Sequence, residues 1–364
     1  MFATLGGSLP VLPPPGGAAP DDAVPNGLAE RQVAAAVAAQ EHAGLEALTD
    51  GGLRHDDPVR VLAEGLEGID VREPSAKRDP PPVARTLPTW RGPILVDGWL
   101  ATAGLTALPV KQALIGPYTL GRRIAPGTLG RDHVTRALAE ALNAELRALA
   151  AAGCPLLEVV EDAATLIGDD PSERRLFRDA QRRLLAGMDG THCSLAIRGG
   201  NADTAGAATI LDAPYSSYLF DLCAGPDNWR LIVDVPADRG VVVGAADART
   251  ADPDTLEILS FAIGYAASTG ERGHARVGLA TSGDMDGLPP AVAVAKMERI
   301  GEAARLYASA PGELARAIDP RSIDIRSGAF GRYAPSAGMS PADALARAIA
   351  ETEAETEAEA EKDA

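Results

Sequence analysis

Eight short apolar runs alternate with helical stretches along most of this chain of 364 residues. We expect the runs to be strands, at residues 2–8, 45–52, 109–117, 155–163, 191–201, 216–223, 240–247 and 275–283. Because most of them are apolar almost without a break, both faces of each strand should be buried, as in a parallel sheet. Helices are expected at 28–44, 131–153, 169–187, 252–270 and 289–308. The pattern predicts an α/β fold, a (β/α)8 TIM barrel.

A doubly wound open sheet is the alternative fold. Such a sheet usually carries a phosphate-binding glycine turn after its first strand, immediately before a helix. Here the first run ends in "TLGGSLP", which is not G-x-G-x-x-G, and the next helical stretch begins far downstream. The barrel is therefore favoured.

The domain organisation follows from where the alternation stops. We expect one barrel domain over residues 1–311, with a Pro-rich insert at 72–92. That insert has too many prolines and charges for a core and should be a covering loop or arm. Residues 312–364 form a C-terminal extension, which ends in an acidic tail, "ETEAETEAEAEKDA".

The formal net charge is −17, which argues against a nucleic-acid partner because such a surface repels phosphate backbones. No apolar run approaches the roughly 18 residues of a membrane helix, and the first residues lack the pattern of a signal peptide. The chain has only three cysteines, and their spacing is not that of a disulfide framework. This favours the reducing environment of the cytoplasm. We therefore expect a small-molecule substrate, no nucleic acid or membrane partner, and a monomer or homodimer.

Polar residues at the carboxyl ends of the runs are the candidate site, because barrel enzymes carry their chemistry there. The candidate substrate-binding residues are Ser8, Asp50, Arg54, Tyr118, Arg198, Asn201, Asp221, Ser282 and Asp284, and Asp162 lies among them. The candidate catalytic residues are Glu161, Asp247 and His192, each of which is a possible general base. Most of these residues also have a structural interpretation, as caps or turn residues. Lys111, inside a run, is expected to pair rather than to react.

Seven motifs occur in one order across nearly the whole chain: "TLGGSLP", "AAQEHAGLEALTDGGLRHDD", "PVKQALIGPYTL", "PLLEVVEDA", "SLAIRGGN", "VVVGAAD" and "LATSGDMDGLPPAVAVAKMERI". Together they resemble the cobalamin-independent methionine synthase family in its single-barrel form, which shares its barrel with uroporphyrinogen decarboxylase. The runs at 40–51 and 116–120 are the most specific. The resemblance implies methyl transfer from a methyltetrahydrofolate-type donor to a thiol that a zinc ion activates.

The zinc ligands that the resemblance implies are missing. The family holds its metal with a His-x-Cys pair on the fifth strand, a Glu after the sixth and a Cys after the eighth. If the "RGGN" turn sets the register, the pair falls on Ala196 and Arg198, whereas if His192 sets it, the Cys falls on Ser194. The Glu position falls near Leu219, Phe220 or Asp221, and the last Cys position falls on Ser282, so that we expect no zinc. A replacement site from His192 and Cys223 is the remaining possibility, since His192 and Cys193 point to opposite faces of a strand.

The family's clamp for the ammonium group of homocysteine is also absent. Its two carboxylate positions are occupied here by Gly52 and Val160, whereas Ser8, whose counterpart contacts the carboxylate of the acceptor, remains. We therefore expect a divergent, zinc-free enzyme, most simply a folate-dependent methyl or one-carbon transferase acting on a small molecule other than homocysteine. The alternatives are a metal-independent lyase or decarboxylase, with Arg54 and Arg198 on substrate carboxylates, a zinc-dependent thiol methyltransferase with substituted ligands, and a non-catalytic binding protein.

Overall fold

The computed structural model describes residues 1–13, 25–72 and 80–309, and its centre is a parallel barrel. Seven strands are hydrogen-bonded in the order β1 (Phe2–Thr4), β9 (Val277–Thr281), β8 (Gly240–Ala246), β7 (Ser217–Asp221), β6 (Cys193–Ile197), β5 (Leu156–Val160) and β4 (Lys111–Ile115). Each neighbouring pair in this series is parallel.

The eighth strand of the barrel is very short. Ala47 bridges Thr4 of β1, and Leu48 bridges Val110, which immediately precedes β4, both in the parallel sense. The strand expected at 45–52 is thus reduced to isolated bridges, and these close the sheet between β1 and β4. The predicted (β/α)8 fold is confirmed.

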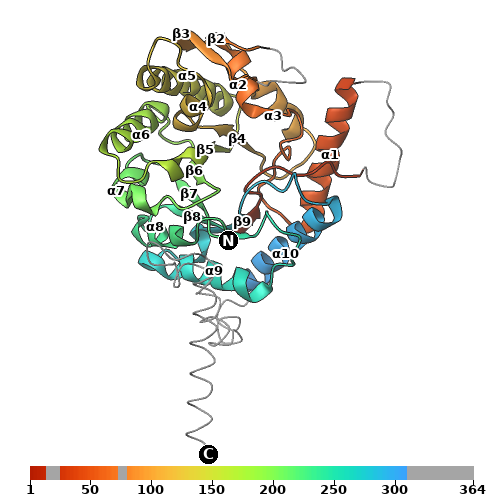
Figure 1. The fold of residues 1–364 in the computed structure, drawn as a ribbon. Helices are drawn as coiled ribbons and strands as arrows, with labels where there is room; N and C mark the ends of the chain where they lie inside the picture. The colour runs from red at the N-terminus through yellow and green to blue at the C-terminus, as the bar shows by residue number, and fades with distance from the viewer. Residues whose placement is uncertain (14–24, 73–79, 310–364) are drawn as a thin grey trace, which may run out of the picture.

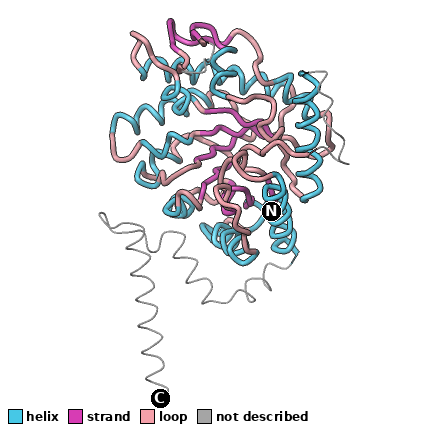
Figure 2. Tube along the Cα trace, turned by 45° about the vertical axis from the view of Figure 1, so that its right-hand side comes forward, coloured by secondary structure: helices cyan, strands magenta, loops and turns pink. Residues whose placement is uncertain are grey.

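The helices form a ring outside the strands, as Figure 1 shows in a view along the barrel and Figure 2 in a turned view. The longer ones agree with the sequence to within a few residues: α1 (Pro25–Ala43), α5 (Arg131–Ala151), α6 (Pro171–Leu184), α9 (Leu256–Ser268) and α10 (Pro290–Ser309). Shorter helices complete the ring, namely α2 (Pro58–Gly65), α3 (Val96–Ala103), α4 (Pro117–Arg123), α7 (Ala207–Ile210) and α8 (Trp229–Asp234). Asp170 caps the first turn of α6, because its carboxylate accepts hydrogen bonds from the backbone of Ser172 and Glu173.

The strands alternate between two buried faces. One face packs against the helices in the main core, whereas the other contributes to a small apolar cluster inside the barrel, formed by Val160, Ala196, Leu219, Val242 and Ala280 with Phe2 packed against it. Because side chains two residues apart share a face, Glu158 and Asp162 lie on the inner face of their strand with Val160. Arg198 and Ser194 likewise lie on the inner face with Ala196.

The insert differs from the expected loop. Residues Val83–Trp90 form β3, which pairs antiparallel with β2 (Leu66–Asp70) and packs on α5. The indole N–H of Trp90 donates to the buried Glu145 of α5 at 2.8 Å, and the backbone of Ile94 and Leu95 donates to the same carboxylate. Prolines and charges are tolerated here because the hairpin is two-stranded and one face stays open to solvent.

The extension expected at 312–364, with its acidic tail, lies outside the described residues. Within the described part of the chain, no helix is long and apolar enough to span a membrane.

Candidate active site

A cavity of about 630 Å³ opens at the carboxyl ends of the strands. Its lining comes from the loop after β1, from the loop between Thr49 and Leu62, from β4, and from the ends of β5, β6 and β9. This is the face on which the sequence places the candidate site. Of the twelve candidate residues, Ser8, Asp50, Arg198 and Asp284 line the cavity, and Asp162 lines it with them.

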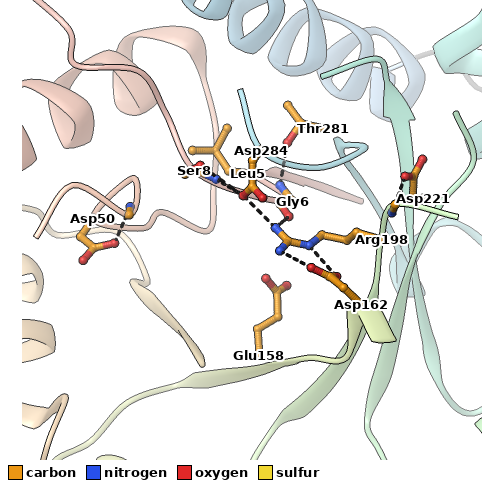
Figure 3. A network of polar contacts seen from close by, with 12 residues as sticks. Leu5, Gly6, Ser8, Asp50, Glu158, Asp162, Arg198, Asp221, Thr281 and Asp284 are labelled. Atoms are coloured by element: carbon orange, nitrogen blue, oxygen red, sulfur yellow. Dashed lines mark hydrogen bonds and ion pairs between the residues drawn. The ribbon is translucent and has the colours of Figure 1, made fainter. Parts of the chain in front are cut away.

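Arg198 is the centre of the polar network (Figure 3). Its guanidinium binds Asp162 through two nitrogens, at 3.1 and 2.9 Å, in the bidentate arrangement that fixes both side chains. A third nitrogen donates to the carbonyl of Gly6 at 2.8 Å and to Asp284 at 3.0 Å. Arg198 therefore joins the ends of β1, β5 and β6 to the loop after β9.

Asp284 connects this network to Ser8. Its Oδ1 atom accepts hydrogen bonds from the backbone of Ser8 at 2.8 Å and from the Ser8 hydroxyl at 3.2 Å. Burial raises the pKa of Asp284, but the charge of Arg198 and the two Ser8 donors outweigh it, so that this pKa lies below its usual range. Asp284 is thus an ionised carboxylate, and its Oδ2 atom accepts no hydrogen bond from the described residues.

The "TLGGSLP" stretch has a steric function. A Cβ atom at Gly6 would overlap with the carbonyl of Thr281, and one at Gly7 would overlap with the backbone of Gly283 and Asp284. The two glycines therefore allow the loop after β1 to lie against the loop after β9, which brings Ser8 to Asp284.

The floor of the cavity carries a buried ion pair. The Lys111 ammonium donates to Glu158 at 2.8 Å and to the carbonyl of Leu5 at 2.6 Å, and both side chains of the pair are at most 5% exposed. Lys111 pairs as expected. Glu158 is a cavity residue that sequence reasoning did not select, because it lies within a strand rather than at its end.

Glu161 directly follows β5, and its side chain points outward, away from the cavity. Its carboxylate accepts hydrogen bonds from the backbone of Tyr118 and Thr119, from the Thr119 hydroxyl and from the Gln181 amide. These contacts place it at the start of α4, where a carboxylate complements the helix dipole. Glu161 does not line the cavity, and the general-base role expected for it is not supported because the residue is enclosed by four donors.

Tyr118 and Arg54 also point elsewhere. The Tyr118 hydroxyl donates to Glu173 of α6 at 2.6 Å, and its ring packs edge-on against Phe177. Arg54 binds Glu30 of α1 and the Thr102 hydroxyl of α3. Neither side chain lines the cavity, since both face the surrounding helices.

Three further candidates fix loops. Asp221 accepts from the backbone of Gly199, Cys223 and Ala224, and burial raises its pKa although these donors oppose the shift. Asn201 exchanges hydrogen bonds with Asp227 in the loop after β7. The Ser282 hydroxyl accepts from the backbone of Ala248 at 3.0 Å. Each has the structural role that its position in a turn allows.

Asp247 and His192 are not brought to the cavity either. Asp247 follows β8 but pairs with Arg249 two residues later, at 2.9 Å. His192 immediately precedes β6, at the end of the strand opposite to Arg198, and contacts the Ser217 hydroxyl at 2.9 Å. Burial lowers the pKa of this histidine. The three residues proposed as general bases are therefore separated from one another and from the cavity.

Comparison with known proteins supports the resemblance at the level of the fold. The structure matches a B12-independent methionine synthase from a Shewanella species with a TM-score of 0.71 and 17% identity, over 86% of this chain and 98% of the other. A putative vitamin-B12-independent methionine synthase from Listeria monocytogenes matches with a TM-score of 0.67 and 14% identity, over 84% and 97%. A methyltransferase from Methanosarcina mazei matches with a TM-score of 0.57 and 15% identity, over 84% and 94%.

Among curated proteins, the chain is 30% identical over 149 residues to the 5-methyltetrahydropteroyltriglutamate–homocysteine methyltransferase of Caulobacter vibrioides. The match covers 39% of this chain and 19% of that protein. No protein-family profile matches. The structural matches show that most of the chain has the barrel fold of the B12-independent methionine synthases, which is the fold that the motifs imply.

The residues at the family's metal positions do not fit zinc. Ala196 and Leu219 belong to the apolar cluster inside the barrel, the Arg198 cation is bound by two carboxylates, and the Ser282 hydroxyl is engaged by backbone. No group of three or more His, Cys, Asp or Glu side chains with metal-binding geometry occurs in the described ranges. His192 and Cys223 lie at opposite ends of the barrel strands, which excludes a replacement site from that pair. The side chains at these positions therefore support no reaction step that depends on a bound metal.

Proposed function

We propose that this protein is a one-carbon transferase that moves a methyl group from a methyltetrahydrofolate-type donor to a small molecule other than homocysteine, without zinc. The observation that carries the proposal is the cavity of about 630 Å³ at the carboxyl ends of a methionine-synthase-like barrel, lined by Ser8, Arg198 and Asp284. Methionine synthesis and methyl transfer, the activities for which these similar proteins are named, supply the reaction type.

Two cavity positions support an acceptor other than homocysteine. Gly52 and Val160 occupy the places at which the family's ammonium-binding carboxylates are expected, and both line the cavity. Neither side chain carries a charge. A substrate that depends on those two carboxylates therefore has no partner there.

The chain's own residues suggest how transfer would proceed. Asp284 Oδ2 accepts a hydrogen bond from the acceptor, whose lone pair attacks the methyl carbon of the donor. The new bond to carbon forms as the bond between the methyl group and the donor nitrogen breaks, and the proton that the acceptor loses passes to the donor nitrogen, so that the donor leaves as a neutral secondary amine. Arg198 fixes Asp162 and Asp284 before the substrate arrives, so that the site is preorganised.

The rim of the cavity offers a place for the donor's carboxylates. Arg123 lines the cavity and is exposed, and it makes no ion pair with any other described residue. Its position favours contact with a negatively charged tail at the entrance rather than at the floor.

Isothermal titration calorimetry with methyltetrahydrofolate tests the donor. We expect binding in the millimolar range or below, and weaker binding by Arg123→Ala. Arg175→Ala, which removes an arginine on α6 away from the cavity, is the matched control. No heat of binding by the wild-type protein would refute the folate part of the proposal.

The decarboxylase alternative is less favoured. The two arginines expected to hold substrate carboxylates are engaged within the protein, because Arg54 binds Glu30 and Arg198 binds two aspartates. The thiol alternative requires a metal or another means of activating a thiol, which the residues at the expected positions do not supply.

For the protein as a whole, we also propose a small-molecule substrate, a cytoplasmic location, no nucleic-acid or membrane partner, and a monomer or homodimer. The division into a barrel at 1–311 and an extension at 312–364 is likewise proposed. Light scattering of the purified protein checks the oligomeric state.

A further inference from the structure

The ammonium group of Lys111 reaches across the seam at which the barrel closes. β1 and β4 are the two ends of the seven-strand series, and within the described chain only the isolated bridges at Ala47 and Leu48 lie between them. Lys111 is the first residue of β4, and its ammonium donates at 2.6 Å to the carbonyl of Leu5, which directly follows β1. Because Leu5 and Lys111 both line the cavity, this contact joins the two strands from the side of the cavity.

The peptide group between Leu5 and Gly6 is held at both of its polar atoms. Its carbonyl oxygen accepts from Lys111, and its N–H, which belongs to Gly6, donates to the Thr281 hydroxyl at 2.8 Å. The next carbonyl, that of Gly6, accepts from Arg198 at 2.8 Å (Figure 3). Two successive peptide groups are thus fixed by side chains that come from β4, from β9 and from the end of β6.

This segment needs contacts from outside because it has little stiffness of its own. Gly6 and Gly7 are adjacent, and glycine has the widest range of backbone conformations and loses the most entropy when it is ordered. Ser8 follows them and binds Asp284 through its amide and its hydroxyl. A peptide group that is fixed at Leu5 therefore limits where Ser8 can lie.

The ion pair behind this contact is a poor source of stability. Lys111 and Glu158 are both buried, and their charged atoms lie 2.8 Å apart. Taking two charges out of water costs about as much as their attraction returns, so that apolar residues of similar volume are often equally stable in such a place. A role in positioning accounts for this pair better than a role in stability.

We propose that Lys111 is a positioning residue of the cavity: Glu158 orients it, and it fixes the peptide group after Leu5 so that Ser8 meets Asp284. Residues 5–11 line the cavity without a break, so that their position decides the shape of the space that a ligand enters. The inference rests on the proposed function only in making that ligand the methyl donor or its acceptor. The fixing of the wall itself does not depend on the reaction.

Two variants that differ only at residue 111 isolate the contact. Glu158→Gln keeps the nitrogen that donates to Leu5, whereas Lys111→Met combined with Glu158→Gln removes it and leaves no unpaired buried charge. Hydrogen exchange of the Gly6 and Ser8 amides should be at least about fivefold faster in the double variant than in Glu158→Gln. Urea denaturation should show that the double variant is at least as stable as Glu158→Gln, so that the faster exchange is local.

A second buried lysine provides the matched control. Lys296 of α10 donates to Asp254 at 3.0 Å and to the carbonyl of Asp252 at 2.8 Å, and none of these three residues lines the cavity. Lys296→Met combined with Asp254→Asn therefore removes the same kind of pair at another place. This variant should leave the exchange of the Gly6 amide unchanged.

Calorimetry with methyltetrahydrofolate adds a readout of ligand binding. The double variant at Lys111 and Glu158 should bind it at least about threefold more weakly than Glu158→Gln, because the loosened wall must be ordered again when the ligand enters. The control variant at Lys296 and Asp254 should bind it like the wild type.

The proposal is overturned if the double variant and Glu158→Gln exchange alike at Gly6, or if the control variant also exchanges faster there. It is equally overturned if faster exchange leaves the Kd of a wild-type ligand unchanged. A wild-type protein that does not bind methyltetrahydrofolate refutes the transferase alone, and the exchange rates then decide whether Lys111 fixes the wall.

Discussion

At the scale of single residues, Arg198 and Glu161 show how differently two charged side chains at strand ends are used. Arg198 faces into the barrel and holds Asp162 and Asp284 in the cavity. Glu161 faces outward and accepts four hydrogen bonds at the start of α4. One of them organises the site, and the other supports the wall around it.

Replacing Arg198 with lysine should destabilise the protein. The charge remains, but the bidentate contact with Asp162 and the simultaneous contact with Gly6 are lost. The free energy of unfolding should fall by roughly 1–3 kcal/mol, and the loss is no larger because solvent partly screens the two aspartates. Urea denaturation measures the change. Arg182→Lys, whose pair with Asp212 is largely exposed on the arginine side, should cost below about 0.5 kcal/mol. Equal losses in both variants would contradict the role of Arg198.

Glu161 should make stability depend on pH. Burial raises its pKa to about 7, although Thr119, Tyr118 and Gln181 donate to it. Between about pH 4.5 and pH 7 the folded protein keeps a proton that the unfolded chain releases, so that the free energy of unfolding falls as pH rises, by about 3 kcal/mol in all.

Chemical denaturation across this pH range measures that slope. Glu161→Gln should be less stable overall but should lack this part of the slope, whereas Glu140→Gln, an exposed change on α5, should retain it. An identical slope in wild type and Glu161→Gln would exclude Glu161 as its source.

At the scale of elements, the start of α4 depends on a close approach between two chain segments. Gly116 is the residue before this helix, and a Cβ atom there would overlap with the Glu161 carboxylate. The sequence "IGPYTL" therefore uses glycine because the helix must begin directly against β5.

Gly116→Ala should lower the free energy of unfolding by about 1–3 kcal/mol through this overlap. Gly287→Ala is the matched control, since a Cβ atom there meets nothing within 4 Å, and it should change stability by less than about 0.5 kcal/mol. Thermal denaturation measures both. A Gly116→Ala protein as stable as the control would show that the helix start can move.

At the scale of the whole molecule, the barrel closes although one of its eight strand positions contributes only the isolated bridges at Ala47 and Leu48. The long ring helices and the inner apolar cluster hold the strands in place, and the loops at the carboxyl ends are left to shape the cavity. The site is therefore built from segments far apart in sequence, such as Ser8 and Asp284.

The whole molecule should contain no structural or catalytic zinc. Elemental analysis of the purified protein should give less than about 0.1 zinc per chain, because the donor set lacks the thiolate and imidazole ligands that zinc requires. Treatment with a chelator should leave the unfolding temperature unchanged. Stoichiometric zinc would restore the thiol methyltransferase as the leading reaction.

The sequence by itself determined the barrel, the positions of the long helices and the departure from the zinc ligands of the family. Alternating apolar runs and helices have few ways to bury both strand faces, and a missing cysteine is visible without coordinates. It also placed Ser8, Arg198 and Asp284 at one end of the barrel.

Only the tertiary structure decided which side chains face the cavity. Glu158, Val159 and Val160 of β5 and the next residue, Glu161, are all buried, so that the sequence has no polar alternation to tell the inner face from the outer one. A shift of one residue exchanges Glu161 for Asp162 at the site. The choice depends on how the strand is rotated against its neighbours, and that rotation is set by the packing of the ring helices and the inner cluster together.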